Sequence, residues 1–105
     1  LTLALLLPLG STGASATVVK KDSGSRSFSN AWSSTPVNDS DKTFKYGYNT
    51  TAINEDYTHT YHRTKGHTAY VKNVSNQQTL KKSKGSYAKA EIRHKSGKVF
   101  YEYSY

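Results

Sequence analysis

The stretch "SYAKAEIR" (residues 86–93) carries small or apolar side chains at every second position, with larger polar or charged ones between them. Ala88, Ala90 and Ile92 would share one face of an extended chain, whereas Lys89 and Glu91 would share the other. Successive side chains of a β-strand point to opposite sides, so a period of two is typical of a strand with one buried face. The stretch therefore predicts a half-buried strand.

A second alternating stretch follows closely. "VFYEYSY" (residues 99–105) places Val99, Tyr101 and Tyr103 on one face. Between the two stretches, "HKSGK" offers a turn at Ser96-Gly97. Two strands separated by a short turn of this kind predict a β-hairpin.

The remainder of residues 44–105 repeats the pattern. "TFKYGY" and "HTAYVKN" also alternate, and Tyr, Thr and Val suit a pleated, half-buried surface. No segment shows a helical stripe. We expect five or six short strands with loops near 49–54, 63–66, 74–85 and 94–98. They predict an all-β fold, a small antiparallel β-sandwich of two short sheets or a barrel.

The first sixteen residues, "LTLALLLPLGSTGASA", differ in composition from the rest of the chain. A secretory signal peptide typically has a short apolar run, a break such as Pro8, and a small-x-small pattern such as Ala14-Ser15-Ala16. We expect the sequence to start partway into such a signal peptide. A membrane anchor would need about 18 apolar residues, roughly twice the run present. The absence of Cys is common among exported proteins of Gram-positive bacteria. We expect export to the extracellular space of such a bacterium.

Residues 17–43 form a polar segment. They are rich in Ser, Thr, Asp and Asn, with few large apolar groups. A segment of this composition buries too little apolar surface to offset the entropy lost on ordering. It is predicted to be a flexible arm or propiece, with the folded domain beginning at residue 44.

The basic charge is concentrated in the expected domain. Residues 44–105 hold eleven basic and four acidic residues, a net charge of +7, and all nine tyrosines. A basic exported domain attracts polyanions such as teichoic acids, anionic lipid head groups, phosphorylated wall precursors or nucleic acid. Solubility alone is the alternative role for this charge.

The stretch "HTYHRTKGH" (residues 59–67) contains three histidines and raises the question of a metal site. On a strand, His59 and His62 would point to opposite faces, and zinc needs three or four convergent ligands. A pair of His62 and His67 across a hairpin stays open. No nucleophile motif or carboxylate pair accompanies the histidines, so we expect no metal, no cofactor and no enzymatic activity.

Basic and aromatic side chains together favour binding of phosphorylated amphiphiles or sugars. Cations bind the phosphates, and rings stack on flat sugar faces. We expect this binding surface to centre on Tyr61, His62, Lys65 and His67, which join both kinds of group at one hairpin. The alternative is that the tyrosines fill a core that is short of Leu and Ile.

An ordered set of short motifs resembles the lactococcin 972 family of exported bacteriocins. The set runs Thr17-Val18-Val19, Phe44-Lys45-Tyr46-Gly47, Tyr57 with Tyr61-His62, His67-Thr68-Ala69-Tyr70-Val71, Gly85-Ser86-Tyr87-Ala88-Lys89-Ala90, and Tyr101 with Tyr103. The chain departs from the family at Phe44 and Tyr87, where the family usually has Trp, and in its longer polar segment at 20–43.

The resemblance implies a fold and a function. It implies a β-sandwich of two small antiparallel sheets and non-enzymatic killing of related Gram-positive bacteria. The expected partner is a cell-wall precursor, in particular lipid II, or another anionic envelope component, with a homodimer possible and no dedicated nucleic-acid partner. The alternative is a secreted module that holds anionic wall polymers or extracellular nucleic acid without killing.

The Ala14-Ser15-Ala16 pattern predicts cleavage after Ala16. N-terminal sequencing of the protein from culture supernatant should begin at Thr17. A secreted protein that still carries the apolar residues 1–9 would contradict this prediction.

Overall fold

The computed structural model describes residues 17–105, which form eight β-strands and no helix. The strands are β1 (Val18–Asp22), β2 (Trp32–Asn38), β3 (Lys42–Asn49), β4 (Glu55–His62), β5 (His67–Lys72), β6 (Gln77–Lys82), β7 (Ala88–Arg93) and β8 (Phe100–Ser104). The predicted all-β class is confirmed. Across the described part of the chain, no helix exists that is long and apolar enough to span a membrane. The predicted signal peptide, residues 1–16, lies outside the described residues.

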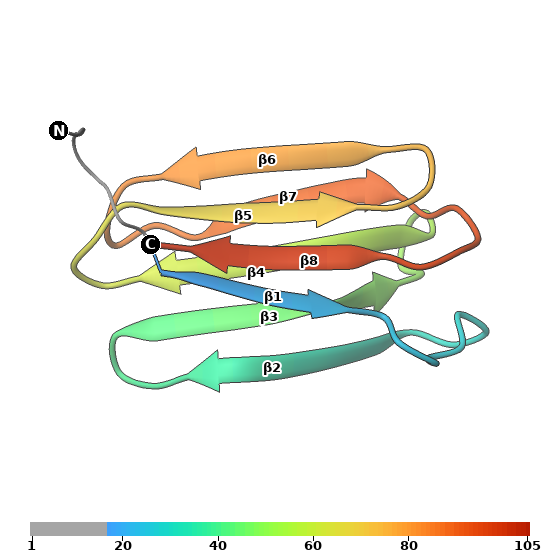
Figure 1. Ribbon diagram of the computed structural model, residues 1–105, viewed down its shortest axis with the longest axis horizontal. Helices are drawn as coiled ribbons and strands as arrows, with labels where there is room; N and C mark the ends of the chain where they lie inside the picture. Colours follow the sequence, from blue (N-terminus) through green and yellow to red (C-terminus); the bar gives the residue numbers. More distant parts are fainter. Residues whose placement is uncertain (1–16) are drawn as a thin grey trace, which may run out of the picture.

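The strands form two stacked antiparallel sheets of four strands each (Figure 1). One sheet has the order β1-β8-β5-β6, and the other has the order β2-β3-β4-β7. The chain runs back and forth along one axis. As a result the β2–β3, β4–β5 and β6–β7 connections lie at one end of the sandwich, together with the C-terminus, and the other connections lie at the opposite end (Figure 1). This arrangement gives the sandwich two ends with different loops.

Residues 17–43 contribute a strand to each sheet, which corrects the predicted flexible arm and its boundary at residue 43. β1 pairs with β8 along its whole length, and β2 pairs with β3 across a bulge between Ser34 and Val37. Both are edge strands. An edge strand needs only a few inward side chains, here Val19 on β1 and Trp32 and Val37 on β2. An edge strand is ordered mainly by its backbone hydrogen bonds to the neighbouring strand, and amino-acid composition gives no indication of these bonds.

The last two strands are not a hairpin, which corrects the prediction made from Ser96-Gly97. β7 pairs with β4 in one sheet, whereas β8 lies between β1 and β5 in the other. The turn itself is present, since Gly97 adopts a φ of 122°. Both stretches need a buried face, and placing them in opposite sheets lets both faces meet the same core.

The predicted loop at 74–85 also needs correction, because it contains β6. The sequence of this strand, "QQTLKK", is almost wholly polar, and only Leu80 packs against the core. β6 is the outer edge of its sheet, so most of its side chains face solvent. Such a strand carries little of the alternation from which strands are predicted.

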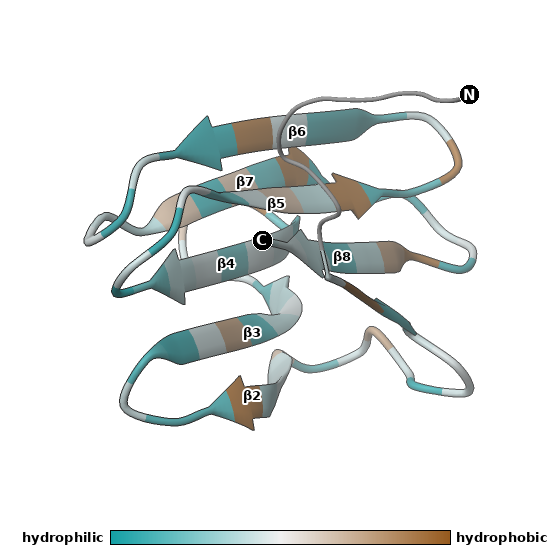
Figure 2. Ribbon diagram, turned by 60° about the vertical axis from the view of Figure 1, so that its left-hand side comes forward, coloured by the Kyte–Doolittle hydropathy of each residue, from teal (hydrophilic) through white to brown (hydrophobic). Residues whose placement is uncertain are grey.

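Aromatic rings fill the space between the sheets. Phe44 and Tyr46 of β3 face Tyr101 and Tyr103 of β8, with centroid separations of 5.7 Å for Phe44–Tyr103 and 4.5 Å for Tyr46–Tyr101. All four rings are buried. Figure 2 shows hydrophobic and hydrophilic bands alternating along the strands, as expected for sheets with one buried face.

Small side chains on the neighbouring strands make room for these rings. Ala88 and Ala90 of β7 and Thr58 and Thr60 of β4 are fully buried. The Thr58 hydroxyl donates a hydrogen bond to the Tyr70 carbonyl at 2.8 Å, which ties the two sheets together. Five of the nine tyrosines are buried, so the expected filling of the core by tyrosine holds for these.

The hydroxyl groups of the two fully buried tyrosines differ in their hydrogen bonding. Tyr103 donates its hydroxyl hydrogen to the Tyr61 carbonyl at 2.6 Å, whereas the Tyr101 hydroxyl is buried with no partner in the described part of the chain. Burial raises the pKa of both phenols well above the ordinary value. Both rings therefore act as neutral core groups at any physiological pH.

Gly47 allows the edge strand β2 to approach β3 closely. A Cβ at this position would collide with the Trp32 carbonyl oxygen and would lie 2.9 Å from the Ser33 Cα. Both obstacles are backbone atoms, which cannot rotate away. A glycine is therefore required where the bulged strand packs against β3.

We expect Gly47→Ala to lower the free energy of unfolding by roughly 1–3 kcal/mol, as for other overpacked sites. Gly66→Ala is the matched control, because its Cβ would meet only the Lys82 carbonyl at 3.7 Å, an ordinary contact. Urea denaturation of both variants measures the difference. Equal stabilities of the two variants would contradict the close approach at Gly47.

Candidate functional site

The histidine-rich stretch spans the end of β4, a turn, and the start of β5, and it crosses from one sheet to the other. β4 and β5 are not paired with each other, so the expected hairpin is wrong. Of the four predicted binding residues, Tyr61 is half-buried and Lys65 is exposed, whereas His62 and His67 are buried. The structure thus brings Tyr61 and Lys65 to the surface and places the two histidines beneath it.

His62 holds the turn from inside. The backbone N–H groups of Thr64 and Lys65 both donate to its Nδ1 atom, each at 3.1 Å. Its ring also packs on the Tyr105 ring, with centroids 5.0 Å apart. Burial lowers the pKa of His62, and the nearby Lys65 and Lys42 charges lower it further. A neutral imidazole with an unprotonated Nδ1 is the form that accepts both hydrogen bonds.

His67 supports the other side of the same turn. Its Nδ1 atom lies 3.3 Å from the Lys65 carbonyl oxygen. Its Nε2 atom is buried and has no hydrogen-bond partner within residues 17–105. His62 and His67 therefore fix the path of the turn that carries Lys65, and neither offers a ring to solvent.

The predicted separation of His59 from His62 is confirmed. His62 faces the core, whereas His59 lies on the outer face of the β2-β3-β4-β7 sheet, with its Nε2 atom 2.8 Å from a carboxylate oxygen of Glu91. Among the described residues, no three His, Asp or Glu side chains are grouped so that they could hold a metal ion. The absence of a metal and of a cofactor stays a prediction.

The surface around Tyr61 and Lys65 also includes residues that the sequence did not predict to belong to the binding surface. The Tyr61 ring packs on the Tyr87 ring, with centroids 5.0 Å apart. The Lys42 and Lys65 ammonium groups lie 6.0 Å and 5.9 Å from the centroid of the Tyr105 ring. Those distances are in the range of cation–π interactions. Tyr87 and Tyr105 therefore extend the surface on both sides of the turn.

Two further lysines belong to the same end. Lys82 is paired with His67 across the β5–β6 ladder, and Lys84 lies in the β6–β7 turn. That turn contacts the end of β4, because the Gly85 N–H donates to the His62 carbonyl at 2.8 Å. We refer to this surface as the basic end; its members are Lys42, Tyr61, Arg63, Lys65, Lys82, Lys84, Tyr87 and Tyr105.

Only some cations of the basic end are neutralised. Lys42 forms a salt bridge with Asp39 at 3.2 Å, and Arg63 forms one with Asp41 at 2.6 Å. Lys65, Lys82 and Lys84 have no carboxylate within 4 Å in the described part of the chain. The result is a locally positive surface with three tyrosine rings at its edge.

The sequence contains a partial signal for this surface. Tyr61 and Lys65 are only four positions apart in the chain, and that closeness pointed to them. Tyr87, Tyr105 and Lys84 come from other turns and from the C-terminus, so only the strand order brings them together. A pattern along one stretch cannot predict such a meeting.

A buried acid–base pair lies at the opposite end of the sandwich. Asp56 is completely buried, and its carboxylate accepts hydrogen bonds from His94 Nδ1 at 2.8 Å and from Asn73 Nδ2 at 3.0 Å. The His94 ring packs between Phe28 and Tyr48, with centroids 4.3 Å and 4.9 Å away. These contacts join several loops, so the pair acts as a structural link. The absence of enzymatic activity stays a prediction.

The chain matches no family model, no curated protein and no solved structure.

The buried His62 makes stability dependent on pH. Because its pKa in the folded state lies below the ordinary value of 6.5, the unfolded chain takes up the proton first as the pH falls. The contribution of the neutral His62 to the free energy of unfolding is complete above about pH 6.5. It decreases as the pH falls through the lowered folded-state pKa of His62.

We expect the free energy of unfolding to fall between pH 7.5 and pH 5.5, and His62→Gln to reduce that fall. Glutamine keeps a side-chain acceptor for the turn but does not titrate. Urea midpoints at the two pH values measure the effect. An equal fall in the variant and the unsubstituted protein would contradict a neutral, buried His62.

Proposed function

We propose that this chain is an exported cationic bacteriocin that captures an anionic cell-wall precursor at its basic end and so blocks septum and cell-wall synthesis. The observation that carries the proposal is that Lys65, Lys82 and Lys84, which lack carboxylate partners among the described residues, lie at the same end of the sandwich as three tyrosine rings (Figure 1). The Lys65 ammonium group is 5.9 Å from the centroid of the Tyr105 ring. Ammonium groups bind phosphate oxygens, and aromatic rings stack on flat sugar faces.

The two kinds of group have separate tasks in this proposal. The lysines attract the phosphate through solution, which makes the first encounter dependent on salt. The Tyr61–Tyr87 pair then contacts the sugar portion of the precursor, because the two packed rings offer a wide aromatic surface at the same end of the sandwich. His62 and His67 fix the turn, which keeps Lys65 in place before the ligand arrives.

The choice of precursor follows from the resemblance to the lactococcin 972 family. A positive, aromatic surface would also suit teichoic acid or nucleic acid, so the chemistry alone supports an anionic envelope component. The ordered motifs, including Gly85–Ala90, favour lipid II as the specific ligand, with Tyr87 standing where the family usually has Trp. The non-killing surface-binding module is the competing outcome of the test below.

We expect residues 17–105 to bind vesicles that contain lipid II more tightly than vesicles without it. Raising the salt concentration from low to physiological should remove part of this binding, since exposed charges are screened beyond about 10 Å at 0.1 M. Replacing Lys65, Lys82 and Lys84 with Ala should abolish the salt-dependent part. Replacing Tyr61 and Tyr87 with Ala should abolish the salt-resistant part.

The matched control removes the same charge elsewhere. Lys20, Lys72 and Lys98 are exposed and lie outside the basic end, so their replacement with Ala should leave most of the binding intact. Equal binding to vesicles with and without lipid II would refute precursor recognition and favour the generic module. Growth inhibition of a panel of related Gram-positive bacteria then separates killing from retention, and the Tyr61/Tyr87 variant should lose it.

A further inference from the structure

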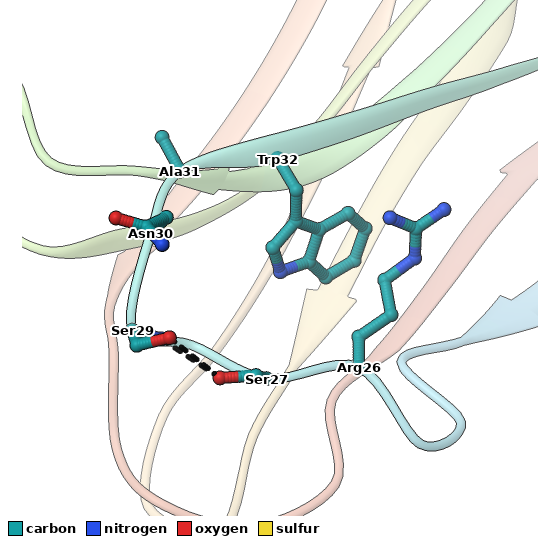
Figure 3. A pocket seen from close by; sticks show the side chains of 6 residues that line it. All are labelled: Arg26, Ser27, Ser29, Asn30, Ala31 and Trp32. Atoms are coloured by element: carbon teal, nitrogen blue, oxygen red, sulfur yellow. Dashed lines mark hydrogen bonds between the residues drawn. The ribbon is translucent and has the colours of Figure 1, made fainter.

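The loop between β1 and β2 forms a second candidate site, at the end of the sandwich opposite the basic end (Figure 1). Residues 23–31 fold back over the start of β2 at the opposite end of the sandwich (Figure 1). They form an open pocket of about 200 Å³ whose walls are Arg26, Ser27, Ser29, Asn30, Ala31 and Trp32 (Figure 3). A water molecule in the liquid occupies about 30 Å³, so the pocket has room for one compact chemical group.

Trp32 gives the pocket a fixed wall. Its ring meets the edges of the Tyr46 and Tyr101 rings, with centroids 5.9 Å and 6.2 Å away, and it packs on Phe28. Tyr46 and Tyr101 belong to the buried core. The indole is therefore packed against the buried core.

The Arg26 guanidinium lies over this indole, with its central carbon 4.3 Å from the ring centroid (Figure 3). Within residues 17–105 it forms no salt bridge. A guanidinium carries five N–H donors in a planar fork, and contact with one ring leaves donors available to an acceptor. Arg26 is thus an exposed cation that is held against Trp32 and forms no ion pair among the described residues.

The remaining walls are rich in hydrogen-bond donors and contain no carboxylate. The Ser27 and Ser29 hydroxyls form a hydrogen bond with each other at 2.8 Å, which leaves one hydroxyl hydrogen for a ligand, and Asn30 adds an amide. The Trp32 Nε1–H is buried and has no acceptor in the described part of the chain. A buried donor without an acceptor is costly, so this indole N–H would gain from an added acceptor.

We propose that this pocket binds a small oxyanion, a carboxylate or a phosphate group, through a two-point contact with Arg26. Arg is the side chain best suited to such planar, bidentate recognition, and a serine hydroxyl and the Asn30 amide supply further donors. The pocket is separate from the basic end, so it would recognise a second group of a larger ligand or an independent small anion.

Trp32 is the only tryptophan in the chain, so its fluorescence reports on the pocket directly. Residues 17–105 are titrated with sodium phosphate and with sodium acetate at constant ionic strength, with sodium chloride and glucose as controls. We expect a saturable change with phosphate or acetate and none with chloride or glucose. The tighter of the two anions identifies the preferred group.

Substitutions at Arg26 test whether its guanidinium binds the anion. Arg26→Ala should weaken anion binding at least tenfold, and Arg26→Lys should weaken it several-fold, because lysine keeps the charge but loses the planar fork. Lys20→Ala, an exposed charge on β1, should bind as the unsubstituted protein does. If Arg26→Ala does not fold, as judged by circular dichroism, Arg26→Lys carries the test. No saturation, an equal change with chloride, or unchanged affinity in the folded Arg26 variants would overturn the proposal.

Discussion

The packing of tyrosine rings between the two sheets is the constraint on which the rest of this structure depends. Residues 17–105 contain one Leu, two Ile and no Cys, and the largest fully buried side chains are Tyr101, Tyr103 and Phe44, with Tyr46 packed against them. Large rings from β3 and β8 require small partners, which explains the alanines of β7 and the threonines of β4. The strand order places the large rings of β3 and β8 against each other and the small side chains of β4 and β7 beside them.

The same rings connect the core with both ends of the sandwich. Tyr103 donates to the Tyr61 carbonyl at the basic end, and Tyr101 contacts Trp32 beside the pocket. Each candidate surface is therefore attached directly to a buried aromatic group. Rigid attachment lowers the entropy cost of binding, because the side chains that meet a ligand are already positioned.

Alternation in the sequence was sufficient to predict the all-β class and several of the strands, because inward Ala, Val and Tyr side chains recur at every second position in β5, β7 and β8. It failed for β1, β2 and β6, whose order depends mainly on backbone pairing at the sheet edges. It also did not predict the strands with which β7 and β8 pair. A turn at Gly97 indicates that the chain changes direction, but it does not indicate which sheet the next strand joins. For the same reason Tyr61 and Lys65 could be predicted as surface candidates, whereas Tyr87 and Tyr105 could not.

Hydrogen exchange measured by mass spectrometry can show whether recognition occurs at the basic end. Residues 17–105 are compared with and without vesicles that contain lipid II. We expect exchange to slow in the β4–β5 turn and the β6–β7 turn, where Lys65 and Lys84 lie, and to be unchanged in the β3–β4 turn at the opposite end. Slower exchange confined to the β3–β4 turn, or no change in either β4–β5 or β6–β7, would contradict recognition at the basic end.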